Sequence, residues 1–180
     1  MELVLWQKII IALAGVIALV VTCVVAQPDE YIVERTIAIK APVSKIFAQI
    51  NDFHNWADWS PWEKLDPGMK KTFEDQALGQ GAVCRWTGND KVGEGSMIIT
   101  ESEGNIHVTV RFDFIKPVEM SVQSVFYFTP QGRDTLVKWR MTGKKNFLEK
   151  AAQLLNPGKM DQMFGNDLQN GLAGLKSVTE

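Results

Sequence analysis

Cysteine and histidine are scarce in this sequence of 180 residues, which contains two of each. Cys23 lies in a long apolar run and Cys84 in a predicted strand, so a disulfide would have to link a membrane segment to a folded domain. His54 and His107 fall in different elements, with no cysteine near either of them. The sequence therefore predicts neither a disulfide framework nor a metal site.

A surplus of positive charge is also missing. The chain has 19 Lys and Arg against 21 Asp and Glu, and its basic residues are scattered. Nucleic-acid binding needs a basic patch that neutralises phosphates, so nucleic acid is not an expected partner. The glycine pairs at 79–81 and 93–95 lack the Lys-Ser/Thr ending and the following helix of a phosphate-binding loop, so turns are predicted there.

A long uncharged run is present instead, at residues 9–26. At about 1.5 Å per residue this run spans roughly 27 Å as a helix, close to the ~30 Å hydrocarbon core of a bilayer. Trp6 suits the headgroup boundary, and Lys8 can extend its amine toward the head groups. The pattern predicts one transmembrane helix, with residues 1–27 as anchor and linker and 28–180 as a folded domain.

A cleaved signal peptide is the competing interpretation of the same run. Val24 and Ala26 supply small residues at cleavage spacing before Gln27. The run is nevertheless longer than the roughly 7–15 apolar residues of a signal peptide, which favours an uncleaved, single-pass anchor. Lys8 precedes the run, so the positive-inside tendency places the N-terminus in the cytoplasm and the domain outside it.

The periodicity of apolar residues predicts an α+β domain. Alternation indicates strands at 31–40, 69–74, 82–87, 94–101, 106–115, 120–129 and 135–142. Helical spacing indicates helices at 43–51, 147–155 and 159–177, and a tryptophan-rich loop with one helical turn occupies 54–62. Because six strands follow one another directly, we expect an antiparallel meander packed against helices on one side.

Large apolar side chains fall on one face of these strands, where they either line a cavity or fill a packed core. They are Trp86, Met97, Phe112, Phe126, Trp139 and Met141. Met163 lies on the last helix, where a flexible side chain suits an adaptable pocket. Trp56, Trp59 and Trp62 present the same alternatives, because they either line a ligand mouth or form the core that fixes their own loop.

Asp167 is the most informative polar position. At about 100° per residue, Asp167 and Gly171 project to the middle of the apolar arc of the last helix. Gly171 either allows close approach to the sheet or leaves a gap. A buried carboxylate needs hydrogen bonds. Asp167 is therefore either a polar anchor for a ligand or a local partner for a loop backbone or a tryptophan indole N–H.

No catalytic constellation is recognisable, so an enzyme is not favoured and no cofactor is expected. His54 and Asp58 lie one helical turn apart and form a conceivable base–orienter pair, but no Ser or Cys nucleophile accompanies them. His107 alternates with Arg111 and Asp113 on the polar side of a predicted strand, which indicates a surface residue.

Three stretches of the sequence resemble the polyketide-cyclase-like branch of the START-like (SRPBCC) superfamily. They are YIVERTIAIKAPVSKIFAQINDFHNWADWSPW, GNDKVGEGSM and MFGNDLQNGLAGLK, at residues 31–62, 88–97 and 163–176. The resemblance implies a helix-grip fold, in which a curved seven-stranded antiparallel sheet surrounds a long C-terminal helix, and a ligand cavity lies between the two. It implies no particular reaction, because members include lipid carriers, hormone receptors and aromatase/cyclases.

These observations together favour a membrane-anchored binding protein for a small hydrophobic or amphiphilic ligand, such as a lipid, a quinone or an aromatic compound. The expected site residues are Trp86, Met97, Phe112, Phe126, Trp139, Met141, Met163 and Asp167. Two alternatives stay open. One is a cyclase-like or hydrolase-like enzyme that uses Asp167 or the His54/Asp58 pair. The other is an interaction module whose pocket is filled by its own side chains.

Overall fold

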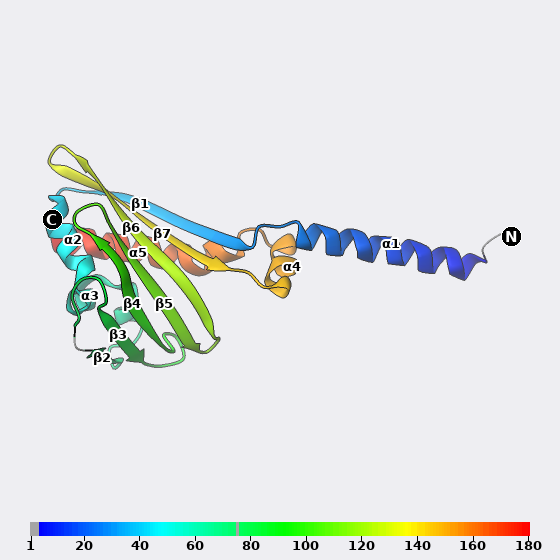
Figure 1. Ribbon diagram of the computed structural model, residues 1–180, viewed down its shortest axis with the longest axis horizontal. Coiled ribbons are helices and arrows are strands. Elements are labelled where there is room, and N and C mark those ends of the chain that lie inside the picture. Colours follow the sequence, from blue (N-terminus) through cyan, green and yellow to red (C-terminus); the bar gives the residue numbers. More distant parts are fainter. Residues whose placement is uncertain (1–3, 75) are drawn as a thin grey trace.

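The computed structural model describes residues 4–74 and 76–180. A long N-terminal helix, α1 (Leu5–Val25), projects from an α+β body (Figure 1). The strands of the body are β1 (Glu30–Ile39), β2 (Lys70–Glu74), β3 (Val83–Thr87), β4 (Glu94–Glu103), β5 (His107–Lys116), β6 (Met120–Gln131) and β7 (Asp134–Lys144). Its longer helices are α2 (Val43–Asn51), α4 (Phe147–Leu155) and α5 (Lys159–Thr179).

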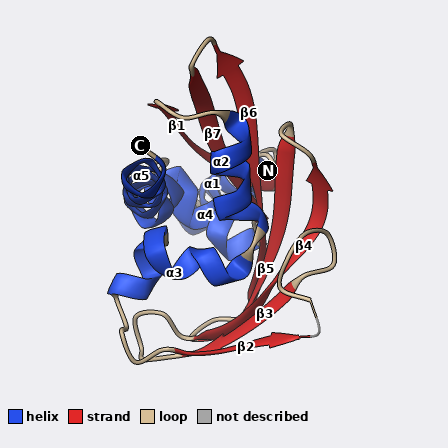
Figure 2. Cartoon of the chain, turned by 90° about the vertical axis from the view of Figure 1, so that its left-hand side faces the viewer, coloured by secondary structure: helices blue, strands red, loops and turns tan. Residues whose placement is uncertain are grey.

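The seven strands form one antiparallel sheet in the order β1-β7-β6-β5-β4-β3-β2. The sheet curves, and the helices of the body lie on its concave side (Figure 2). The helix-grip fold and the α+β class are thus confirmed. The predicted strands and the three longer helices of the body match the observed ones to within two residues at each end, and the strands do so because each has one face on the core and alternates accordingly.

The tryptophan-rich loop is three short helical turns, η1 (Phe53–Asn55), α3 (Trp56–Trp59) and η2 (Pro61–Lys64). The indole Nε1 of Trp56 donates to the Ile50 carbonyl oxygen at 2.9 Å, and that of Trp59 donates to the Gln49 carbonyl oxygen at 3.2 Å. Both indoles are buried. They therefore hold the segment against the end of α2. Trp59 agrees with the core interpretation, whereas Trp56 also lines the cavity described below.

Two glycines let helix α5 approach the aromatic core closely. A Cβ on Gly171 would lie 2.6 Å from the Trp139 ring, and one on Gly174 would collide with the Trp59 carbonyl oxygen. Gly171 therefore serves close approach, which decides between the two alternatives that the sequence left open for it. The C-terminal half of α5 is consequently seated directly on the aromatic core.

Helix α1 is almost entirely exposed. Its most apolar 18-residue window has a mean hydropathy of 2.8 and is 6% buried, so the helix is long and apolar enough to cross a membrane and is not a core helix. Its one buried residue is Val24, near the end that contacts α4. Cys23 is exposed on this helix and Cys84 is buried in β3, and both are free thiols.

Candidate ligand-binding cavity

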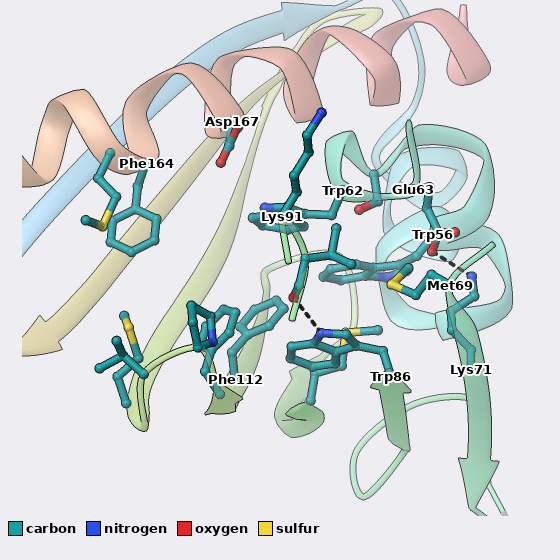
Figure 3. A pocket seen from close by; sticks show the side chains of 18 residues that line it. Trp56, Trp62, Glu63, Met69, Lys71, Trp86, Lys91, Phe112, Phe164 and Asp167 are labelled. Atoms are coloured by element: carbon teal, nitrogen blue, oxygen red, sulfur yellow. Dashed lines mark hydrogen bonds and ion pairs between the residues drawn. The ribbon is translucent and has the colours of Figure 1, made fainter. Parts of the chain in front are cut away.

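A cavity of about 330 Å³ lies between the sheet and the N-terminal half of α5. Side chains of β3, β4 and β5 form its floor, and α5 contributes Met163, Phe164 and Asp167 from above (Figure 3). The α3–η2 segment closes one side through Trp56 and Trp62. The cavity is therefore built from three parts of the chain that are distant in sequence.

Aromatic rings brace one another around the cavity. The Trp86 ring meets the Phe114 ring edge-to-face with centroids 5.4 Å apart, and its Nε1 donates to the Val92 carbonyl oxygen at 3.1 Å. The Trp62 and Phe112 centroids lie 5.9 Å apart. Gly95 lets Trp86 lie against β4, because a Cβ there would come within 2.6 Å of the indole. The contacts between neighbouring rings and the indole hydrogen bond hold these side chains in position around the cavity.

Asp167 brings a carboxylate to this apolar space, and Figure 3 shows it directed from α5 toward the cavity. Burial raises the pKa of Asp167, and the neighbouring Trp62 side chain opposes this shift without cancelling it. A raised carboxyl pKa reflects the cost of keeping the charged form away from water. Trp62 and Asp167 thus line the same cavity, and the carboxylate faces the space.

A second polar feature is the ion pair between Lys71 and Glu63. Their Nζ and Oε1 atoms are 2.6 Å apart, and the two side chains are 16% and 20% exposed. Lys91 adds an exposed amine at the rim. Apart from Glu63, Lys71, Lys91 and Asp167, the side chains that line the cavity are mostly aromatic rings and methionines (Figure 3). This arrangement suits an apolar molecule that carries a small polar group.

A sequence profile described as polyketide cyclase / dehydrase and lipid transport matches residues 31–180. The chain belongs to this family. No curated protein matches the sequence. The family description covers both catalysis and transport, so membership establishes the helix-grip architecture and does not select one activity.

Solved structures resemble the chain at low sequence identity, and such likeness shows the fold alone. Protein jhp0584 from Helicobacter pylori has a TM-score of 0.62 at 12% identity, covering 86% of this chain and 90% of its own. The di-domain ARO/CYC StfQ from the steffimycin biosynthetic pathway has 0.60 at 11%, covering 83% and 50%. Protein CV1439 from Chromobacterium violaceum has 0.55 at 12%, covering 86% and 99%.

The cavity of this family member brings together five of the eight expected site residues, namely Trp86, Met97, Phe112, Met163 and Asp167. The other three, Phe126, Trp139 and Met141, do not line it and are at most 1% exposed. The Phe126 and Trp139 rings pack at 4.6 Å between centroids. Trp139 lies directly against Gly171 of α5, and the packed-core alternative describes all three residues.

Other lining residues were not singled out from the sequence. They are Ser60, Glu63, Met69, Lys71, Lys91, Val92, Phe114, Pro117, Val118, Met120 and Phe164. Alternation does place Phe114 on the inner face of its strand. Alternation carries no information about which stretch of a strand lies beneath a cavity. The Lys71–Glu63 ion pair joins residues from separate elements, so sequence spacing does not indicate it either.

The proposed pairing of His54 with Asp58 is wrong. His54 Nδ1 lies 2.9 Å from Asp52 Oδ1, and the same carboxylate accepts a hydrogen bond from the His54 amide. Asp52 caps η1, and this local geometry captures the imidazole. His54 and Asp58 are exposed and do not line the cavity. Over residues 4–74 and 76–180, no three His, Cys, Asp or Glu side chains are grouped as metal ligands.

Proposed function

We propose that this protein is a membrane-anchored binding protein whose cavity holds a small hydrophobic or amphiphilic molecule. The observation that carries the proposal is the cavity of about 330 Å³, lined mainly by aromatic rings and methionines together with a few charged groups. Small-molecule sites begin at about 300 Å³, so the space suits one compact ligand or one part of a longer lipid. The ring stack favours quinone-like or aromatic ligands alongside acyl chains.

The anchor in this proposal is α1. Its apolar side chains are exposed along almost the whole helix, and a surface of this kind is stable only in lipid or against another apolar partner. Lys8 precedes the apolar run, so the positive-inside tendency favours a domain outside the cytoplasm. A tethered domain meets membrane-dissolved ligands at high effective concentration, which suits a carrier or sensor of such ligands.

The mouth of the cavity supports the same interpretation. Val118 and Met163 line the cavity, yet they are 65% and 52% exposed, so apolar side chains reach from the interior to the surface at this point. Met163 belongs to the half of α5 that follows α4 and lies on the same side of the body as α1 (Figure 1). A ligand leaving the bilayer would therefore meet the cavity on its nearer side.

One observation favours an enzymatic alternative, in which Asp167 acts as an acid or base on a bound substrate. Its raised pKa and its position at the cavity are what such a role requires. The two candidates separate in the Asp167→Asn variant. A binding protein keeps most of its affinity in this variant, whereas an enzyme that depends on the carboxyl group loses turnover.

The test is to purify the full chain in detergent and to identify co-purifying molecules by native mass spectrometry and lipid analysis. We expect one apolar molecule per chain. Met163→Glu places a charge at the mouth and should lower ligand occupancy severalfold. Gln169→Glu is the matched control, because Gln169 is exposed on the same helix and does not line the cavity. An empty protein that also fails to bind a panel of lipids, quinones and aromatic polyketides would overturn the proposal.

A further inference from the structure

Helix α4 presents its apolar side outward. Leu155 and Leu148 are 91% and 75% exposed, and Phe147 and Leu154 are 51% and 44% exposed. At 100° per residue these four side chains share one side of the nine-residue helix. A helix on the surface of a soluble protein normally turns such a stripe toward the core. This orientation therefore requires a partner that covers the apolar side.

The polar side of α4 is held against the rest of the protein. Lys150 is 8% exposed and forms an ion pair with Asp29. The carbonyl oxygen of Lys150 accepts a hydrogen bond from Gln27 Nε2 at 3.0 Å, and Gln153 Oε1 accepts one from Lys145 Nζ at 2.8 Å. These bonds tie α4 to the linker that follows α1 and to the end of β7. The helix cannot roll its apolar side inward without breaking them.

The position of α4 indicates what covers it. It contacts α1 near Val24, at the end of the apolar run. Figure 1 shows α4 lying across the C-terminal end of α1 rather than continuing it. A spanning helix ends in the headgroup layer, so an element packed on its last turn lies at that depth. Lys144 and Lys159, both exposed, flank the helix in sequence and can reach lipid phosphates from there.

We propose that α4 is a second membrane contact, an amphipathic helix whose apolar side lies in the interfacial layer of the bilayer that α1 crosses. The proposal rests on the anchoring role given to α1 above. Interfacial helices bury their apolar side about 5–10 Å into the boundary between head groups and acyl chains. With α1 as one attachment and α4 as another, the domain has a fixed orientation, and the mouth at Val118 and Met163 is held toward the membrane surface.

Fluorescent labelling of the full chain in phosphatidylcholine vesicles tests this placement. An environment-sensitive dye is attached to cysteine at Leu148→Cys or Leu155→Cys in a Cys23→Ser background. Cys84 stays unlabelled, because it is buried and burial raises its thiol pKa to about 11. Ser177→Cys is the matched control, since it is exposed at the far end of α5. A further sample carries the dye on native Cys23.

We expect a lipid with a nitroxide near its head group to quench the dye at 148 and 155 about twofold or more relative to 177, because an interfacial helix buries its apolar side in this layer. Quenching at Cys23 without quenching at 148 and 155 overturns the role of α4 and leaves the anchor intact. Absence of quenching at all four positions overturns the anchor as well. Blue-shifted emission at 148 and 155 without lipid quenching would show that a protein surface, rather than lipid, covers the apolar side of α4. This outcome also overturns the proposal.

Discussion

Two halves of the space between α5 and the sheet contrast with each other. Toward the C-terminus of α5, Trp139 and Phe126 are fully buried with ring centroids 4.6 Å apart. Toward its N-terminus, Phe164 and Asp167 face Phe112 across a cavity of about 330 Å³. Both halves have the same sheet beneath them and the same helix above, so the difference lies in the side chains that separate the two.

The residues of α5 account for this difference. In the closed half, Gly171 and Gly174 present no side chain, and the helix rests on the Trp139 ring and the Trp59 backbone. In the hollow half, α5 presents the larger side chains of Phe164 and Asp167 to the cavity. One half of the core therefore contributes stability through dense packing, and the other half keeps a space open.

The largest effect should come from emptying the closed half with Trp139→Ala. Removing a fully buried tryptophan costs about 3–5 kcal/mol of unfolding free energy, through lost burial and the cavity left behind. Trp139→Phe should cost much less, because the Trp139 Nε1 has no hydrogen-bond partner among the described residues and a phenyl ring fills most of the site. Chemical denaturation of the full chain in detergent, followed by intrinsic fluorescence, measures both.

Phe114→Ala in the hollow half is the matched comparison for this prediction. Phe114 is only partly buried and borders a space that already exists, so we expect roughly half the loss of Trp139→Ala or less. Equal losses for the two variants would contradict the contrast between a packed half and a hollow half.

A smaller effect is expected from adding one methyl group to the closed half with Gly174→Ala. The new Cβ would collide with the Trp59 carbonyl oxygen, and backbone cannot move aside as a flexible side chain does. Overpacking of this kind costs about 1–3 kcal/mol. Gly104→Ala is the control, because nothing lies within 4 Å of the added Cβ there. A Gly174→Ala variant as stable as Gly104→Ala would show that α5 is not seated as described.

The sequence predicts the outline of this fold well and the division of its core poorly. Alternation places Trp86 and Trp139 on the same side of the sheet, and the structure confirms that both side chains are buried. Alternation reports the face of a strand and nothing about the distance to the layer above it. That distance depends on how Gly171 meets the Trp139 ring and how Gly174 meets the Trp59 backbone, so the separation of cavity from core was not predictable.

Two local features show the same limit of periodicity. The spacing of residues 147–155 predicts an amphipathic helix with the observed bounds, but it does not indicate that the apolar side of α4 faces outward. Likewise, the spacing of His54 and Asp58 suggests a pair, whereas the cap residue Asp52 captures the imidazole. For α4, polar contacts with residues distant in sequence determine the outcome, and for His54 a local cap contact does.

The smallest and most specific effect concerns the charge in the hollow half, through Asp167→Asn. Burial raises the pKa of Asp167 in the folded state, so the folded protein binds this proton more tightly than the unfolded chain does. The resulting stability is fully present below the ordinary Asp pKa and is lost as pH rises through the folded-state pKa. Asparagine cannot titrate. The stability of Asp167→Asn relative to the unmodified protein should therefore increase from acidic pH toward neutral pH and then level off.

Asp161→Asn on the same helix provides a control of opposite sign. The Arg35 guanidinium donates to both Asp161 carboxylate oxygens, at 2.8 and 2.9 Å, and this contact lowers the Asp161 pKa. Its stabilising contribution is present above the ordinary Asp pKa and is lost as pH falls through the lowered value, so Asp161→Asn should lose relative stability toward neutral pH. Thermal unfolding midpoints measured across this range compare the two variants. Parallel pH profiles would mean that Asp167 is paired with a cation, which would contradict its placement as a desolvated carboxyl group beside the cavity.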